Sequence, residues 1–216
     1  MLAIFNPSKF QGFFVILRDM ELAEMQKLLS LVDRFEKVER LVYRTGESRR
    51  ENDAEHTYSL MMSAWFFVSR ANNDDKKLDL EKVLLYIMVH DLVEAYAGDT
   101  DSLSSQGLTG KDEREHQALI ELTQDMNFFP ELPKLIVSYE AQSDAESVFV
   151  KSLDKLMPVF KNLRDNGRSF KDFHGDVDFD SWVTFKETKI KDRDVFQLWL
   201  QAKDETEKRG FLANRG

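Results

Sequence analysis

Four side chains of the types that bind metal ions interrupt apolar stretches of this sequence. His56 opens the run "HTYSLMMSAWF", His90 and Asp91 stand together in "YIMVHDLVEAYAGDT", and Asp154 lies within "SVFVKSLDKLMPVF". An ionised carboxylate on the buried face of a helix is costly unless a cation or several hydrogen-bond donors accompany it. Two imidazoles and two carboxylates in such positions predict one shared divalent-metal site.

Each of these residues also has an ordinary structural explanation when taken alone. A histidine in the first turn of a helix is commonly a surface or capping residue, and Asp154 can pair with Lys151 or Lys155. The joint pattern is more informative, because it places all four at buried-face positions of three expected helices. Their mixed nitrogen and oxygen donors suit Mn²⁺, Co²⁺, Ni²⁺, Fe²⁺ or Zn²⁺ and leave positions for water and substrate.

Two more carboxylates follow the His-Asp pair closely. Glu94 comes four residues after His90, which puts both on one face of a continuous helix, where Glu94 is a candidate to order or deprotonate a water. Asp99 follows Gly98, the residue type that commonly ends a helix. We therefore expect Glu94 to be catalytic and Asp99 to point into the mouth of the site.

The elements that position these residues have helical periodicity, and no strand alternation is visible, so the sequence predicts an all-α, compact multi-helix bundle. Asn52 and Glu55 have the spacing of a capping box at the start of a helix. Segments 101–111 and 166–180 read as loops, the first a candidate flap over the site. The expected helices cover about 19–38, 52–70, 80–97, 111–126, 130–141, 145–165 and 181–206. The buried face of the first is expected to hold Leu22, Met25, Leu29, Val32 and Phe35.

Composition narrows the class of protein. With 216 residues and 42% hydrophobic content, we expect one domain over 1–216, with a motif core at about 30–165 and a C-terminal helical extension at about 180–210. The absence of cysteine excludes disulfides and thiolate ligands. The net charge of -9 disfavours a nucleic-acid polymer as partner. The first 20 residues lack the features of a signal peptide, so a cytoplasmic protein with no membrane partner is expected.

The same residues resemble a known family, the HD-domain metal-dependent phosphohydrolases. Its pattern of a His, then His-Asp, then a distant Asp is matched by His56, His90-Asp91 and Asp154. The segments "ENDAEH", "HDLVEAYAGDT" and "SDAESVFVKSLDKL" resemble the 5′-deoxyribonucleotidase branch more narrowly, over about residues 30–165. The resemblance implies an HD-domain bundle, hydrolysis of nucleoside 5′-monophosphates with one divalent transition metal, and a homodimer.

The resemblance also suggests residues that bind the substrate. The branch uses an arginine ahead of the first His for the phosphate, and Arg40 fits best after one inserted residue, with Arg44 second. Leu41 stands where bacterial members carry a tryptophan credited with selecting deoxyribose, so sugar selectivity stays open. By similarity, Asp99 contacts the sugar hydroxyl or protonates the leaving 5′ oxygen. Lys111, just after the expected flap, is a further candidate for the phosphate.

Two alternatives remain at the level of sequence. The same ligands serve a phosphohydrolase that acts on another phosphoester, such as a cyclic nucleotide or an alarmone. The second alternative is that the chain is a non-catalytic, metal-containing helical regulatory module. His116 and His174 are assigned to neither kind of site, because His116 lies on a highly charged stretch and His174 in an expected loop.

Overall fold

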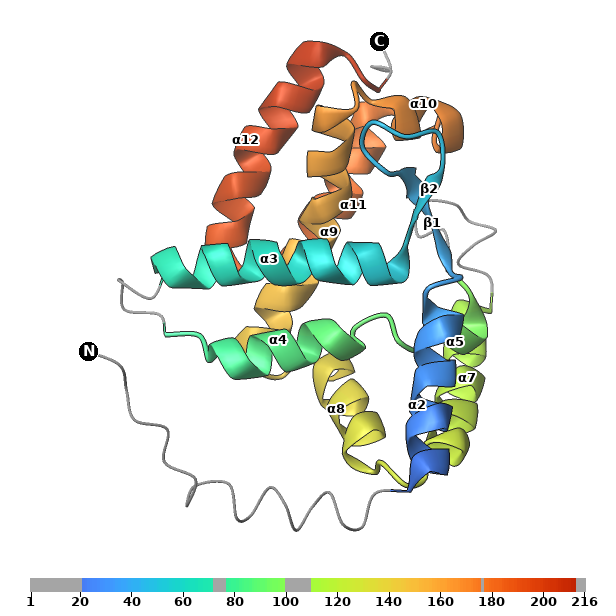
Figure 1. The fold of residues 1–216 in the computed structure, drawn as a ribbon. Coiled ribbons are helices and arrows are strands. Elements are labelled where there is room, and N and C mark those ends of the chain that lie inside the picture. The colour runs from blue at the N-terminus through green and yellow to red at the C-terminus, as the bar shows by residue number, and fades with distance from the viewer. Residues whose placement is uncertain (1–20, 72–76, 100–109, 176, 213–216) are drawn as a thin grey trace, which may run out of the picture.

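Helices dominate the computed structural model, which describes residues 21–71, 77–99, 110–175 and 177–212 (Figure 1). The all-α prediction is confirmed. In the part of the chain described, no helix is long and apolar enough to cross a membrane. The elements in chain order are α2 (Leu22–Phe35), β1 (Glu39–Tyr43), β2 (Arg50–Asn52), α3 (Asp53–Ala71), α4 (Leu80–Val89), α5 (Glu94–Ala97), α7 (Lys111–Asp125), α8 (Glu131–Glu140), α9 (Ala145–Arg164), α10 (Arg168–Phe173), α11 (Phe179–Lys189) and α12 (Arg193–Arg209).

Helix α9 is the central element of the bundle. It packs against α3, α4, α8, α10, α11, α12 and β1. Apolar side chains therefore leave it in several directions, and Phe149, Val150 and Leu156 are fully buried. Because other elements surround α9, a carboxylate at Asp154 in its middle is removed from water, with 2% of its surface exposed. The buried apolar side chains form one cluster from Leu31 to Leu212, while a single domain over 1–216 stays a prediction.

A short antiparallel hairpin joins α2 to α3 and was not expected from the sequence. Glu39 pairs with Asn52 and Tyr43 with Arg50, with an irregular register between them. Strands of five and three residues rich in Arg and Glu are too short and too polar to give a period-two pattern. The capping box at the start of α3 is confirmed, because Asn52 Oδ1 accepts from the Glu55 amide at 2.9 Å and Glu55 Oε2 accepts from the Asn52 amide at 3.2 Å.

The expected continuous helix over 80–97 is wrong, because it breaks at the His-Asp pair. Helix α4 ends at Val89, and α5 begins only at Glu94. Between them the amides of Leu92 and Glu94 donate to carbonyls three residues earlier, at 3.1 and 2.8 Å, which is a tighter turn than an α-helix makes. The expected end at Gly98 is confirmed, with φ at 75°.

Three further expectations need correction. The expected loop over 166–180 contains α10. The expected helix over 181–206 is two helices, α11 and α12. A new helix starts after Asp192, because the Asp192 side chain caps α12 by accepting from the amides of Asp194 and Val195. The expected buried face of α2 is largely exposed, since Leu22 and Leu29 keep 75% and 53% of their surface. Periodicity identifies an apolar stripe but does not say which neighbour covers it. The expected flap at 101–109 lies outside the described residues.

Candidate metal centre

The structure brings the four sequence-predicted ligands together. His56 comes from the first turn of α3, His90 and Asp91 from the turn after α4, and Asp154 from the middle of α9. One donor atom from each lies within 4.8 Å of all the others. His56 Nε2 is 3.0 Å from Asp154 Oδ1, and His90 Nε2 is 2.9 Å from Asp91 Oδ2. Donor atoms this close, on three elements far apart in sequence, form a cluster that could hold one cation.

The imidazole of His90 is oriented for a ligand. Its Nδ1 lies 2.7 Å from the Ile87 carbonyl, so a neutral ring that donates there keeps its lone pair on Nε2. His90 Nε2 is buried, 2.9 Å from Asp91 Oδ2 and 3.9 Å from Asp154 Oδ1, but it makes no well-aligned hydrogen bond among the described residues. Burial lowers the pKa of His90, but the charges of Asp91 and Asp154 outweigh it and raise that pKa. A cation held among these donors would take the place of a proton on Nε2. Burial lowers the pKa of His56 to about 4, which favours the neutral form that metals bind.

Asp154 is buried but surrounded by positive and polar groups. Lys155 Nζ lies 2.8 Å from its Oδ2, while His56 occupies the Oδ1 side. Burial alone would raise the pKa of Asp154, but Lys155 and His56 outweigh it and hold that pKa well below the usual range. The carboxylate is therefore ionised, as a metal ligand must be.

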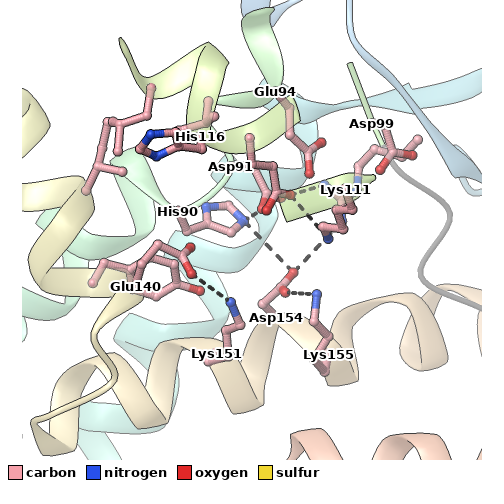
Figure 2. A pocket seen from close by; sticks show the side chains of 16 residues that line it. His90, Asp91, Glu94, Asp99, Lys111, His116, Glu140, Lys151, Asp154 and Lys155 are labelled. Atoms are coloured by element: carbon pink, nitrogen blue, oxygen red, sulfur yellow. Dashed lines mark hydrogen bonds and ion pairs between the residues drawn. The ribbon is translucent and has the colours of Figure 1, made fainter. Parts of the chain in front are cut away.

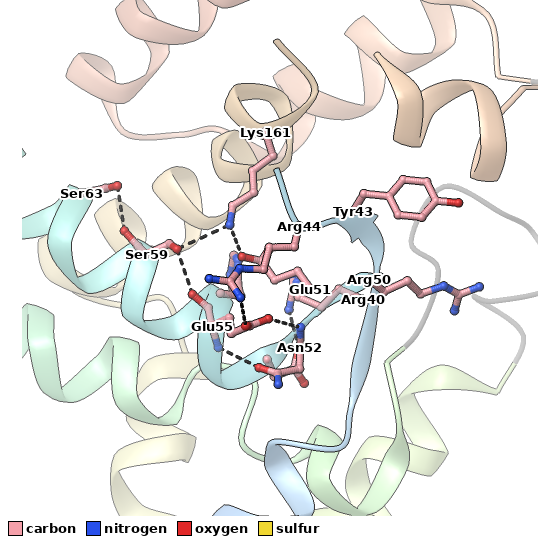
Figure 3. A network of polar contacts seen from close by, with 12 residues as sticks. Arg40, Tyr43, Arg44, Arg50, Glu51, Asn52, Glu55, Ser59, Ser63 and Lys161 are labelled. Carbon is pink, nitrogen blue, oxygen red and sulfur yellow. Dashed lines mark hydrogen bonds and ion pairs between the residues drawn. The ribbon is translucent and has the colours of Figure 1, made fainter. Parts of the chain in front are cut away.

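Of the two candidate arginines, Arg40 enters the centre from β1. Its Nη1 lies 2.7 Å from Asp91 Oδ2 and 2.9 Å from Asp53 Oδ1. Arg44 does not line this pocket; it pairs with Glu55 at 3.2 Å and borders a second cavity on the other side of α3 (Figure 3). The hairpin directs the side chains of Arg40 and Arg44 to different cavities. Sequence patterning did not reveal the hairpin, so it could not separate the two arginines.

Glu94 and Asp99 face the same pocket, although the helical argument for Glu94 does not hold. Glu94 belongs to the short helix α5, and Figure 2 shows its carboxyl group turned toward Asp91. Burial, then the charges of Asp91 and Asp53, raise the pKa of Glu94 well above its usual value. Burial also raises the pKa of Asp99. Two carboxyl groups with raised pKa values beside ionised Asp91 are suited to holding and moving protons.

A cavity of about 240 Å³ is lined by Arg40, Glu94, Asp99 and three of the four candidate ligands, His90, Asp91 and Asp154. Lys111 lines it as expected, with Nζ 3.2 Å from Glu115. His116, which the sequence did not assign to a site, lies on the exposed rim. The remaining lining residues that sequence reasoning missed include Tyr139, Glu140, Lys151 and Lys155. Glu140 pairs with Lys151 at 3.4 Å, so that charge is balanced locally.

Asp53 was also missed, although it directly follows the capping residue Asn52. Its side chain is fully buried, and its Oδ2 has no hydrogen-bond partner within the described part of the chain. Burial raises the pKa of Asp53 to about 7, against the lowering effect of Arg40. The available signal was an extra acidic residue in a helix's first turn, a position where acids are common for reasons of the helix dipole.

Known proteins share both the sequence pattern and the fold. The protein-family model described as an HD domain matches residues 32–199. The human 5′-deoxynucleotidase HDDC2 is 31% identical over 157 residues, which cover 68% of this chain and 74% of that protein. The 5′-deoxynucleotidase hdd1 of Schizosaccharomyces pombe is 25% identical over 146 residues, covering 64% of this chain and 68% of that protein.

A solved structure agrees with these matches. The crystal structure of a predicted metal-dependent phosphohydrolase from Magnetospirillum magnetotacticum superposes with a TM-score of 0.73 at 28% sequence identity. The alignment covers 88% of this chain and 97% of that one. An alignment of this extent is longer than the motif core at about 30–165, so the likeness extends beyond that core.

Proposed function

Because this chain belongs to the HD domain family and is a metal-dependent phosphohydrolase, we propose that it hydrolyses nucleoside 5′-monophosphates, with deoxyribonucleotides as the expected substrates. The observation that carries the proposal is the pocket, where the His/Asp cluster opens onto two proton-holding carboxyl groups and an arginine. The names of the human and fission-yeast relatives support the choice of substrate class.

We assign the metal to His56, His90, Asp91 and Asp154. When bound there, a divalent cation supplies Lewis acidity and lowers the pKa of water from ~15.7 toward neutrality. The donor set suits Mn²⁺, Co²⁺, Ni²⁺, Fe²⁺ or Zn²⁺.

The protein's own side chains account for the proton transfers. Water attacks phosphorus, the bond from phosphorus to the 5′ oxygen breaks, and inorganic phosphate and the nucleoside leave. Glu94 takes the proton from the attacking water, since its Oε2 is buried without a hydrogen-bond partner. Asp99 lines the same pocket with a raised pKa, which favours protonation of the leaving 5′ oxygen over a contact with the sugar alone. Arg40 and Lys111 bind the phosphate, and Arg40 does so from a fixed position on β1.

The test is phosphate release from a panel of ribo- and deoxyribonucleoside 5′-monophosphates. Chelator-stripped protein is reloaded separately with Mn²⁺, Co²⁺, Ni²⁺, Fe²⁺ and Zn²⁺. A cyclic nucleotide and an alarmone are tested in parallel by chromatography of the products, because their hydrolysis yields a nucleoside monophosphate and pyrophosphate, respectively, and not inorganic phosphate. We expect metal-restored turnover of the monophosphates, with the ratio of deoxy to ribo rates reporting the effect of Leu41. Turnover of the cyclic nucleotide or alarmone alone would transfer the assignment to that substrate. No turnover with any metal would favour the regulatory module.

A further inference from the structure

Lys155 lies in the pocket beside the proposed metal ligands. It follows Asp154 on α9, lines the same cavity as Arg40, and keeps 25% of its side chain exposed. Figure 2 shows its ammonium group next to the Asp154 carboxylate, where Nζ and Oδ2 are 2.8 Å apart. Neither the motif nor the proposed mechanism uses this residue.

The cations of the pocket differ in the charges already paired with them. Arg40 gives the same nitrogen, Nη1, to both Asp53 and Asp91. Lys111 pairs with Glu115 and Lys151 with Glu140, and these two carboxylate side chains, neither of them a proposed ligand, are 37% and 53% exposed. Lys155 is paired with Asp154, a carboxylate that we assign to the metal.

This difference determines which ammonium an anion can reach. A carboxylate that ligates a divalent cation has less negative charge to offer a second partner. Lys155 is therefore the pocket lysine whose ammonium is left with the greatest uncompensated charge when the metal is bound. A phosphate dianion in the same cavity would supply the missing negative charge.

The backbone beneath Lys155 is held in place. The ammonium of Lys186 on α11 donates to the Lys155 carbonyl at 2.6 Å, and Lys186 is 5% exposed. Pro158, in the next turn of α9, cannot donate the helical hydrogen bond to Asp154. A contact from a neighbouring helix at this point limits movement of the segment that carries both Asp154 and Lys155.

We propose that Lys155 binds the substrate phosphate directly, as a second cation in addition to Arg40, a role that rests on the proposed phosphomonoester hydrolysis. The probe is inorganic phosphate, titrated calorimetrically into protein loaded with Mn²⁺. Lys155→Met should raise the dissociation constant for phosphate by about 10-fold or more, the effect of losing one charged hydrogen bond. Lys155→Arg should recover most of the affinity, because it restores a cation that can donate.

Lys151→Met is the matched control, since it removes the same charge from the same pocket one turn earlier on α9. It should change the phosphate dissociation constant less than about threefold. An equal loss in both variants would mean that only the general field of the pocket matters, and would overturn the proposal. So would an unchanged phosphate affinity in Lys155→Met.

A purely structural role for Lys155 predicts a different result. If Lys155 only orients Asp154, its loss should weaken Mn²⁺ binding, measured by titration before phosphate is added. If it binds phosphate, Mn²⁺ affinity should stay equal or increase, since a positive charge 2.8 Å from a ligand oxygen is gone. Weakened Mn²⁺ binding that accounts for the whole phosphate effect would reject the direct contact.

The outcome is separable from that of the proposed function. Phosphate binding that depends on Lys155, without turnover of any nucleotide, would leave this proposal standing and remove the nucleotide assignment. Nucleotide turnover together with a phosphate affinity that does not change in Lys155→Met would keep the nucleotide assignment and remove this proposal. Loaded wild-type protein that binds no phosphate would remove Lys155 from this role.

Discussion

The two strands of the hairpin contribute to two polar clusters that differ in how their charges are paired. Arg40 of β1 enters the metal centre. Glu51 of β2 enters a network with Ser59 and Lys161 (Figure 3). Both clusters contain nearly buried carboxylates. Glu51 is 2% exposed, yet its carboxylate accepts from Lys161.

The metal centre instead contains buried acceptor atoms that receive no hydrogen bond. Asp53 Oδ2 and Glu94 Oε2 have no hydrogen-bond partner in the described residues, and the groups nearest to His90 Nε2 are the carboxylates of Asp91 and Asp154. The Glu51 network contributes no such atom. A cluster that pairs its charges internally stabilises the fold, whereas one that leaves lone pairs directed at a common point is arranged for a ligand.

The largest expected effect breaks the metal centre. Asp154 Oδ1 lies 3.0 Å from His56 Nε2 and 3.9 Å from His90 Nε2, so Asp154→Asn removes a charged ligand that lies between the two imidazoles. Bound metal, measured by mass spectrometry after dialysis, should fall to background, and turnover should fall by about 10³-fold or more. His116→Asn, on the exposed rim, should retain the metal. Full metal content in Asp154→Asn would show that Asp154 does not belong to the ligand set.

Glu94→Gln tests the part of the cluster that we assign to chemistry. The amide keeps the size of the side chain but cannot take a proton, so kcat should fall by about 10²- to 10⁴-fold while the metal stays bound. Glu140→Gln is the control, because Glu140 lines the same cavity but is paired with Lys151. Near-normal kcat in Glu94→Gln would remove Glu94 from the mechanism.

The same comparison explains what the sequence could predict. Ligand residues stand out because their types conflict with an apolar helix face, so His56 and Asp154 were found without any structure. The break at His90 and the hairpin were not found, because tight turns and short polar strands lack a periodic signal. Asp53 was overlooked, and Lys155 was considered only as a partner of Asp154, for another reason. Both adjoin residues that were already explained, and a charged residue beside a capping or ligand position is unremarkable until burial is known.

A smaller effect is expected from changes in the network of Glu51 and Lys161, and it should alter stability and not turnover. Lys161→Met leaves Glu51 buried without its cation, which should lower the free energy of unfolding by about 3–5 kcal/mol in urea titrations. Changing both residues, as Glu51→Leu with Lys161→Met, should recover most of this loss. Turnover per metal-loaded molecule should stay within about twofold in the double variant. A large loss of kcat there would mean that the two clusters are coupled through the hairpin.

Lys186 provides the finest test, because it is a buried cation whose close partner is a carbonyl and not a carboxylate. Burial, with the charge of Lys155 adding to it, lowers the pKa of Lys186 to about 7. In the unfolded chain the pKa of a lysine is about 10.4, so between these values the unfolded state binds more protons than the folded state. The free energy of unfolding should therefore rise with pH from about 7 upward, by at most about 1.4 kcal/mol per pH unit.

Lys186→Met isolates this contribution from the other titrating groups. Urea titrations between pH 6 and 9 should show the variant more stable than wild type at the lowest pH, with the difference shrinking as pH rises. A constant difference would mean that Lys186 stays charged in the fold, held by the Lys155 carbonyl and the nearby carboxylates. In that case, the fold would stabilise a buried cation beside the metal centre without a direct carboxylate partner. Direct pairing of charges would then no longer distinguish the Glu51–Lys161 network from the metal centre.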